Sequence, residues 1–265
     1  MERLKDKIAI VTGSSSGFGR AIAKEFAKEG AKVVCSDIRR EARKGEYDAD
    51  KDTPTDEAIR NMGGESIFVK CDVSKLEEVK SLVKAAVDKF GRLDITVNNA
   101  GVFTRMGAIH EKTEKELDFT MNVNFKGTWN GCQQAIIQFR KQGGGGKIIN
   151  VVSLGGVVGL ALVPAYCASK GAVALLTKQL AIDYGPDKIN VNGICPSYGI
   201  TPMCREYYEF SYDNPKWRAK IEDVTPLKRW VKPEEVAKLC VFLASSDSDY
   251  ISGDLIPIDG GYLAK

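Results

Sequence analysis

The chain has 265 residues, 43% of them hydrophobic, and a formal net charge of +3 at pH 7, so it is long enough for one large α/β domain or two small ones with a substantial core. The small charge, without a dense lysine–arginine cluster or a nucleic-acid motif, argues against a nucleic-acid partner. No stretch approaches the roughly 20 apolar residues of a membrane helix, and the N-terminal apolar run is too short for a signal peptide, which argues against a membrane protein.

Apolar runs of strand length alternate with segments of helical period along the chain. In order, strands are predicted at 7–13, 32–37, 66–73, 93–101, 146–153, 188–196 and 254–261. Helices are predicted between them, at 19–30, 75–91, about 113–141, 165–185 and 232–245. This alternation predicts an α/β fold, a doubly wound parallel sheet of about seven strands with helices on both faces. Because no composition break or internal repeat divides the chain, we expect a single domain over residues 1–265.

Residues 38–65 do not follow this alternation of strands and helices. The segment is half charged and carries Pro54 and two adjacent glycines. We interpret it as a surface excursion with one short helix near 54–62, for which a solvated loop is the default structure and a partner contact the alternative.

The stretch TGSSSGFG (12–19) follows the first predicted strand and opens the first helix. In that setting Gly13 allows the tight turn, Gly17 lets the backbone approach a pyrophosphate, and Gly19 lets helix and strand pack closely. The helix N-terminus then favours the phosphate charge. The stretch predicts a dinucleotide-binding loop rather than a turn without a ligand, with cofactor contacts from Gly13, Ser15, Ser16, Gly17, Phe18 and Gly19.

Asp37 ends the second predicted strand and is the expected discriminator between NAD and NADP. A carboxylate there can accept hydrogen bonds from both ribose hydroxyls of NAD, and its charge repels the 2′-phosphate of NADP. Ser16, not a basic residue, precedes the second glycine of the loop, although Arg39 and Arg40 lie close behind Asp37 and could counter the repulsion. We predict NAD as the cofactor, with NADP less favoured; an aspartate that only satisfies a turn is the alternative.

Asp72, at the end of the third predicted strand, has two open interpretations. Its carboxylate could accept a hydrogen bond from the adenine amino group, or it could cap the following helix. Ser74 is itself the expected cap of that helix, with Glu77 as its capping-box partner. The contacts predicted at the adenosine end of the cofactor are Asp37, Ile38, Asp72 and Val73.

The stretch YCASK (166–170) places Tyr166 and Lys170 four residues apart, on one face of a predicted helix. A nearby ammonium stabilises a phenolate and lowers the pKa of a tyrosine from its usual value of about 10, so such a tyrosine can act as general acid or base. On its own, a pair at this spacing is usually only helix surface. Its interpretation depends on the residues that accompany it.

Several motifs accompany the pair in a fixed order. The glycine-rich loop comes first, NNAG (98–101) ends the fourth predicted strand, Asn124 lies in NVNFKG, and Ser153 precedes Tyr166 by 13 residues. With these motifs the chain resembles the short-chain dehydrogenase/reductase family, in the common subfamily of this length, from about residue 4 to 262. The resemblance implies a Rossmann-type fold and an oxidoreductase that transfers a hydride between NAD(H) and a secondary alcohol or ketone.

The resemblance further implies a catalytic tetrad of Asn124, Ser153, Tyr166 and Lys170. Tyr166 would exchange the proton with the substrate oxygen, which Ser153 would hold by a hydrogen bond. Lys170 would bind the nicotinamide ribose hydroxyls and lower the tyrosine pKa, and Asn124 would hold a water that links Lys170 to solvent. This chemistry needs neither a metal nor a histidine, so the single histidine, His110, is expected in a surface loop.

In the family, the stretch that corresponds to CPSYGIT (195–201) covers the nicotinamide. The family commonly has glycine where Ser197 stands and a branched aliphatic residue where Gly199 stands, so the backbone path of this loop and the contact from Gly199 stay open. The cofactor contacts implied around the nicotinamide are Asn99, Ala100, Gly101, Tyr166, Lys170, Pro196 and Thr201.

Residues 202–230 correspond to the substrate lid of the family and are rich in aromatic residues, namely Tyr207, Tyr208, Phe210, Tyr212, Trp217 and Trp230. Such rings could stack on a cyclic, apolar or sugar-like substrate, or they could pack the lid onto the body or onto another subunit. The apolar stretch 153–166 would form the opposite wall. We therefore predict a cyclic, hydrophobic or sugar-like secondary alcohol or ketone as substrate.

Two other functions compete with this one. An NADPH-dependent carbonyl or 3-oxoacyl reductase is the alternative within the family, and Asp37 and Ser16 argue against it. A catalytically inactive dinucleotide-binding sensor or scaffold is the alternative of another class, and the presence of all four tetrad residues argues against it.

Seven scattered cysteines without a CxxC pair fit reduced, buried thiols better than a disulfide framework. We therefore expect a cytoplasmic protein with a small-molecule substrate and no membrane or nucleic-acid partner. The family resemblance alone implies a homotetramer, or else a dimer, built through the long helices and the C-terminal segment.

Overall fold

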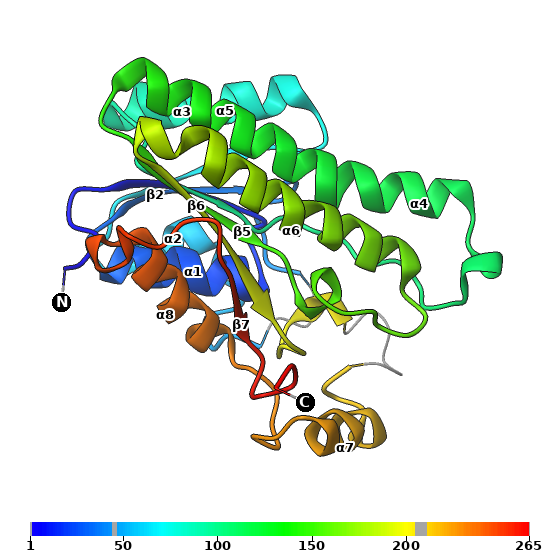
Figure 1. The fold of residues 1–265 in the computed structure, drawn as a ribbon. Coiled ribbons are helices and arrows are strands. Elements are labelled where there is room, and N and C mark those ends of the chain that lie inside the picture. Colours follow the sequence, from blue (N-terminus) through cyan, green and yellow to red (C-terminus); the bar gives the residue numbers. More distant parts are fainter. Residues whose placement is uncertain (1, 44–46, 205–210, 265) are drawn as a thin grey trace.

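The computed structural model describes residues 2–43, 47–204 and 211–264. Within these ranges, seven strands form one sheet in the order β3-β2-β1-β4-β5-β6-β7, and every neighbouring pair is parallel (Figure 1). The predicted doubly wound parallel sheet is therefore confirmed. The strands are β1 (Ile8–Thr12), β2 (Lys32–Asp37), β3 (Ser66–Lys70), β4 (Ile95–Asn98), β5 (Gly146–Val151), β6 (Ile189–Pro196) and β7 (Leu255–Ile258).

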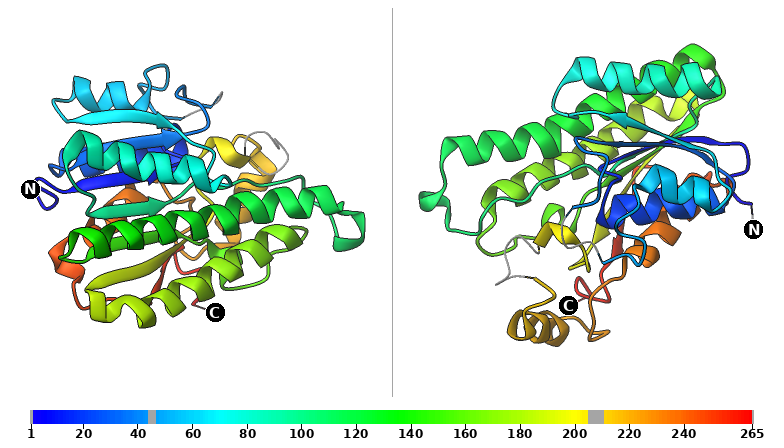
Figure 2. Two further views of the ribbon diagram at one scale, coloured as in Figure 1. Left: turned by 90° about the horizontal axis from the view of Figure 1, so that it is seen from above. Right: turned by 180° about the vertical axis from the view of Figure 1, so that it is seen from behind.

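Helices cover both faces of the sheet (Figure 1). Helices α1, α2 and α8 lie on one face, and α3, α5 and α6 lie on the other, with α4 extending beyond the sheet (Figure 2). The helices are α1 (Gly17–Lys28), α2 (Thr55–Asn61), α3 (Leu76–Phe90), α4 (Glu114–Met121), α5 (Gly127–Gln142), α6 (Pro164–Tyr184), α7 (Pro215–Val224) and α8 (Pro233–Ala244). No helix in these described ranges is long and apolar enough to cross a membrane.

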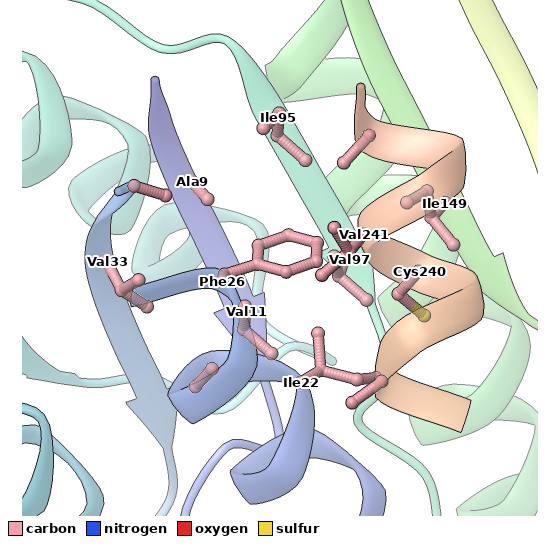
Figure 3. Packing of buried hydrophobic residues seen from close by; sticks show 14 of the residues in the cluster. Ala9, Val11, Ile22, Phe26, Val33, Ile95, Val97, Ile149, Cys240 and Val241 are labelled. Carbon is pink, nitrogen blue, oxygen red and sulfur yellow. The ribbon is translucent and has the colours of Figure 1, made fainter. Parts of the chain in front are cut away.

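The core between α1, the sheet and α8 follows from the helical period. Ile22 and Phe26 are four residues apart on α1, so they share one face, and both are fully buried. Figure 3 shows them beside Val97 of β4 and Val241 of α8, all in one hydrophobic cluster. Burial of each such side chain stabilises the fold by roughly 1.5–3 kcal/mol, so this layer holds β1 and α1 rigidly beneath the loop that joins them.

The strand order places the functional edge of the sheet. The order reverses between β1 and β4, and in open parallel sheets ligands bind at the carboxyl ends of the strands beside such a reversal. The glycine-rich loop follows β1 and the NNAG stretch ends β4. Both predicted cofactor segments therefore meet at this switch point.

Three predicted elements differ in detail from the structure. The long helix expected at about 113–141 is divided into α4 and α5 by a π-helical turn at Asn122–Lys126. The helix after β3 begins at Leu76 with Lys75 at its N-cap, so the expected capping by Ser74 is wrong. Helix α7 was not predicted, although Asn214 accepts hydrogen bonds at its N-cap and Pro215 occupies its first position, a typical start signal.

Candidate active site

A cavity of about 310 Å³ lies at the carboxyl ends of β1, β2, β4, β5 and β6. It brings together most of the residues predicted from the sequence. Ser15, Gly19 and Asn124 are predicted site residues that do not line it. The predicted residues that line it are Gly13, Ser16, Gly17, Phe18, Asp37, Ile38, Asp72, Val73, Asn99, Ala100, Gly101, Ser153, Tyr166, Lys170, Pro196 and Thr201.

The glycine-rich loop lies directly against the NNAG loop. Gly13 has a φ of +64°, which favours glycine, and a Cβ at this position would come within 2.8 Å of the Ala100 Cα. The Asn99 amide donates hydrogen bonds to the carbonyl oxygens of Thr12 (2.8 Å) and Gly13 (3.1 Å). These hydrogen bonds fix the loop at the start of α1, where Gly13 and Gly17, which carry no side chain, line the cavity.

Asp37 ends β2 and faces the same cavity. Its carboxylate accepts hydrogen bonds from the backbone amides of Ser15 (3.2 Å) and Ile38 (2.8 Å). Burial raises the pKa of the Asp37 carboxyl, although these amides act in the opposite direction. Ser15 therefore orients Asp37 from behind the lining and does not itself face the cavity.

Asp72 is occupied by the turn that precedes α3. Its carboxylate accepts hydrogen bonds from the backbone amide (3.0 Å) and the hydroxyl (2.7 Å) of Ser74. These bonds hold the turn before α3, but the N-cap of that helix is Lys75, so the capping role left open for Asp72 is not observed. Because Asp72 also lines the cavity, its contact with adenine stays a prediction.

Tyr166 and Lys170 lie on one face of α6, as their spacing predicts. The Lys170 ammonium lies 5.8 Å from the centre of the Tyr166 ring and donates a hydrogen bond to the Val151 carbonyl oxygen (2.8 Å). Only 4% of Lys170 is exposed. Burial lowers the pKa of this lysine to about 8, a value at which a side chain can accept or release a proton near neutral pH.

Ser153 follows β5 in a strained backbone conformation. Its φ of +121° lies in a region that favours glycine, and a serine there costs about 1–3 kcal/mol. Its hydroxyl oxygen accepts a hydrogen bond from the Gly155 amide (3.2 Å) and lies in the cavity lining with Tyr166. Strain of this kind concentrates at functional sites, where surrounding structure holds it in place.

Asn124 lies behind the lining in the π-helical turn and is fully buried. Its side-chain oxygen accepts from the Val102 amide (2.7 Å), and its side-chain nitrogen donates to the Val102 carbonyl (3.0 Å) and the Ser169 hydroxyl (3.1 Å). A Cβ on Gly101 would lie 3.4 Å from the Asn124 Oδ1 and 3.7 Å from the Lys170 Nζ. The two polar groups therefore border one small space beside Gly101.

The loop after β6 has a defined path. The Val231 amide donates to the Tyr198 carbonyl (3.1 Å), and the Ile200 amide donates to the Val231 carbonyl (3.2 Å), which makes a parallel bridge at Gly199. A Cβ on Gly199 would overlap the ring of Phe18. The large side chain at position 18 therefore explains why this chain departs from the branched aliphatic residue that the family commonly has.

The aromatic residues of 202–230 divide into two groups. Tyr207, Tyr208 and Phe210 lie outside the described residues. Tyr212, Trp217 and Trp230 do not line the cavity but pack on one another and on the loop after β6. The ring centres of Trp230 and Tyr198 are 5.8 Å apart, and those of Tyr212 and Trp230 are 5.5 Å apart. These three rings favour the packing interpretation over substrate stacking.

Part of the lining around Tyr166 was not predicted from the sequence. Phe103 packs against Tyr166 with ring centres 5.5 Å apart. The apolar residues directly after NNAG could have indicated that Phe103 lines the site. For Phe119, no sequence pattern indicated a place in the site, apart from its position on the predicted long helix. His110 lies exposed on a 3-10 turn, as expected. The lining residues that were not predicted include Arg43, Val102, Phe103, Phe119 and Val123, whereas Leu154 and Leu160 belong to the predicted apolar wall 153–166, Tyr198 to the stretch 195–201 and Met203 to the segment 202–230.

Residues 13–263 match the family model described as enoyl-(acyl carrier protein) reductase. An uncharacterized oxidoreductase of Thermotoga maritima is 38% identical over 258 residues, which are 97% of this chain and 98% of that relative. The 2-dehydro-3-deoxy-D-gluconate 5-dehydrogenase of Dickeya dadantii is 37% identical over 262 residues, 99% and 97% of the two chains. A 3-oxoacyl-(acyl-carrier-protein) reductase of Thermotoga maritima is 37% identical over 259 residues, 98% of each.

Solved structures resemble the fold over its full length. A short-chain type dehydrogenase/reductase from Mycobacterium marinum superposes with a TM-score of 0.89 at 30% identity, covering 100% of this chain and 98% of that one. A gluconate 5-dehydrogenase from Burkholderia cenocepacia in complex with NADP and tartrate superposes with a TM-score of 0.88 at 28% identity, with the same coverage.

Proposed function

Because the chain belongs to the short-chain dehydrogenase/reductase family, we propose that it transfers a hydride between NAD(H) and a secondary alcohol or ketone. The observation that carries this proposal is the meeting of Tyr166, Ser153 and Lys170 with the glycine-rich loop in one cavity. The lining fits a dinucleotide, because bare backbone at the start of α1 suits a pyrophosphate and the Asp37 carboxylate lies at the end of β2. When bound, the nicotinamide supplies or accepts the hydride.

In this mechanism, side chains of the protein transfer the proton. Tyr166 exchanges a proton with the substrate oxygen as general acid or base, and the Ser153 hydroxyl donates a hydrogen bond to the same oxygen, so charge that develops there is stabilised. Lys170, with a pKa of about 8, is mostly protonated at neutral pH and is able to pass a proton onward. Asn124 borders the space beside Gly101 into which the lysine points, which supports its role in the relay.

The surroundings of Tyr166 support a hydrophobic substrate. Phe103, Phe119, Leu154 and Leu160 line this part of the cavity. Among the described lining residues, the basic side chains are Arg43 and Lys170, and the latter is already placed at the proton path. A cyclic or hydrophobic alcohol or ketone therefore fits better than the sugar acid named for one relative, although a sugar-like substrate and the 3-oxoacyl reductase activity named for another remain the alternatives.

Asp37 supports NAD as the preferred cofactor. Its carboxylate is placed to accept hydrogen bonds from the adenosine ribose and to repel a 2′-phosphate. The NADP bound to the Burkholderia cenocepacia structure supports the alternative, an NADPH-dependent reductase.

We also propose that residues 1–265 form one cytoplasmic domain in which 202–230 serve as the substrate lid.

Tyr166→Phe tests the mechanism. The variant is expected to lose at least about a hundredfold in turnover while NADH binds as in wild type, since the substitution removes only the phenolic oxygen. Turnover is followed by NADH absorbance with a panel of cyclic secondary alcohols, and binding by nicotinamide fluorescence. Tyr250→Phe, at a fully exposed tyrosine, is the matched control.

Retained turnover in Tyr166→Phe would contradict the assigned role of the tyrosine. A wild-type protein that binds NADH but turns over none of the alcohols or the matching ketones would favour the inactive sensor or scaffold instead.

A further inference from the structure

The charged segment 38–65 is attached to the glycine-rich loop at two points. The Ser15 hydroxyl donates a hydrogen bond to the Arg39 carbonyl oxygen (2.7 Å), and the Ser16 hydroxyl accepts one from the Arg43 amide (2.7 Å). Ser16 itself lines the cavity. The expectation of a solvated loop is therefore wrong for this part of the segment, which is bonded to the wall of the cavity.

Arg20 of α1 holds the next part of the segment. Only 1% of Arg20 is exposed, and its helix begins at Gly17 of the same glycine-rich loop. The guanidinium donates to the carboxylates of Asp48 (3.0 Å) and Asp50 (2.8 Å) and to the Thr53 carbonyl oxygen (2.9 Å). Charge-assisted hydrogen bonds of this kind fix geometry, so the residue directly before Asp48, a tyrosine, has a defined position beside α1.

That residue, Tyr47, reaches from the segment to the proposed lid. Its ring packs edge-on against the ring of Tyr212, with centres 6.3 Å apart and planes at 87°, which is a favourable T-shaped arrangement. Tyr212 packs in turn on Trp230 (5.5 Å), and Trp230 packs on Tyr198 (5.8 Å), which lines the cavity. A continuous row of rings therefore connects the segment after β2 to the loop after β6 by way of the lid.

The lid has other contacts with the body of the molecule. A Cβ at Gly17 would lie 3.2 Å from the Thr201 Cβ, just before the lid begins. Near the other end of the lid, the Leu227 amide donates to the Gly260 carbonyl oxygen (3.1 Å). The Tyr47–Tyr212 pair differs from these contacts because it joins the middle of the lid to a segment that is itself bonded to the glycine-rich loop.

We propose that Tyr47 is a positioning residue that couples coenzyme binding at the glycine-rich loop to closure of the lid over the cavity. The proposal rests on the proposed function, because it assumes that the cavity holds a dinucleotide and that 202–230 serve as the lid. A pyrophosphate on the loop backbone stabilises the loop, α1 behind it and the segment bonded to both. The Tyr212 ring then packs on a fixed surface, so the closed lid is favoured over the open one.

Hydrogen exchange of the full-length protein, with and without saturating NADH, tests this coupling. In wild type, bound NADH is expected to slow exchange in α7 at least about fivefold, and in Tyr47→Ala less than about twofold, because a T-shaped ring pair changes an equilibrium constant by roughly two- to twelvefold. Coupling is reciprocal, so Tyr47→Ala is also expected to bind NADH about two- to tenfold more weakly, measured by nicotinamide fluorescence. Tyr47→Phe keeps the ring and is expected to keep both properties.

Tyr262→Ala is the matched control. The Tyr262 ring lies 6.3 Å from that of Tyr198, the same distance as in the Tyr47–Tyr212 pair, but it belongs to the C-terminal segment and not to 38–65. The control is expected to keep the NADH-dependent slowing in α7, and exchange in β1 and β4 shows that each variant is folded.

Three results overturn the inference while the proposed function stands. They are a slowing in Tyr47→Ala as large as in wild type, an equal loss in Tyr47→Ala and Tyr262→Ala, and a wild-type protein that binds NADH without any change in α7. A wild-type protein that does not bind NADH overturns the proposed function as well.

Discussion

At the scale of single residues, Lys170 combines a charge with almost complete burial. Burial disfavours the charged ammonium and therefore lowers the pKa of Lys170 to about 8, from about 10.4 in an unfolded chain. Between these values the unfolded chain binds more protons than the folded one, so this lysine makes stability rise with pH from about 8 to about 10. Below pH 8 both states are protonated and the cost is constant.

The comparison of wild type with Lys170→Met isolates this effect. Buried thiols act in the opposite direction, since burial raises the pKa of Cys132 to about 12, but this thiol is common to both proteins. The stability of wild type relative to the variant is expected to rise between pH 8 and 10 by an amount on the order of 2 kcal/mol. Urea unfolding without cofactor measures it, and a constant difference would show that Lys170 titrates normally.

Phe18 and Gly199 form a complementary pair between the glycine-rich loop and the loop after β6. A Cβ at position 199 would overlap the Phe18 ring, so Gly199→Val is expected to cost about 1–3 kcal/mol of stability through overpacking. Phe18→Ile makes room, and the double variant is expected to recover most of that loss. A double-mutant cycle by urea unfolding measures the coupling; additive effects would mean that the ring and the loop do not compete for space.

At the scale of elements, Arg20 of α1 anchors residues 48–55 through hydrogen bonds to Asp48, Asp50, Thr53 and Thr55. Arg20→Met removes several charge-assisted hydrogen bonds, each worth about 1.5–3 kcal/mol at most. The side chains of Asp48 and Asp50 are 26% and 39% exposed, so water recovers part of their solvation. A net loss of about 2–4 kcal/mol is expected, measured by urea unfolding.

Lys24→Met is the matched control for that prediction. Lys24 lies one turn further along α1 and pairs with the same two carboxylates, at 2.7 Å and 2.8 Å. Lys24 does not share the hydrogen bonds of Arg20 to the carbonyl oxygens of Asp50 and Thr53, so its loss is expected to cost less than about 1 kcal/mol. Equal losses in the two variants would contradict the role of Arg20 as the anchor.

At the scale of the whole molecule, α5 and α6 present an apolar outer surface. They lie side by side on one face of the molecule (Figure 2) and line a groove of about 520 Å³. Trp129, Ile137, Leu175 and Ile182 are 47%, 54%, 70% and 78% exposed. We expect these exposed apolar side chains to form an interaction surface, consistent with the predicted dimer or tetramer built through the long helices.

Charge on this surface tests the assembly. Ile137→Glu and Ile182→Glu are each expected to reduce the oligomeric state, because association would bury an unpaired carboxylate. Sedimentation velocity measures the mass, and Met62→Glu is the control at an exposed position directly after α2, on the opposite face of the sheet. A monomeric wild type, or variants that assemble unchanged, would contradict an interface on this surface.

The sequence by itself determined the fold and the centre of the site, because both depend on short-range patterns. Alternating apolar strands and amphipathic helices specify a parallel sheet wherever they occur in this order. The glycine spacing after β1 and the four-residue step from Tyr166 to Lys170 depend only on local backbone geometry. The glycine-rich loop, Tyr166 and Lys170 therefore line the same cavity in the structure.

Only the tertiary structure decided which long-range partners meet. Arg43 lies at the cavity because its backbone amide donates a hydrogen bond to the Ser16 hydroxyl of the glycine-rich loop. Arg40 does not line the cavity, because it forms an ion pair with Asp56. Phe18 excludes a side chain at position 199 although the two are far apart in sequence. Contacts of this kind depend on which side chains fill the space between separate elements, and no local period or spacing encodes that.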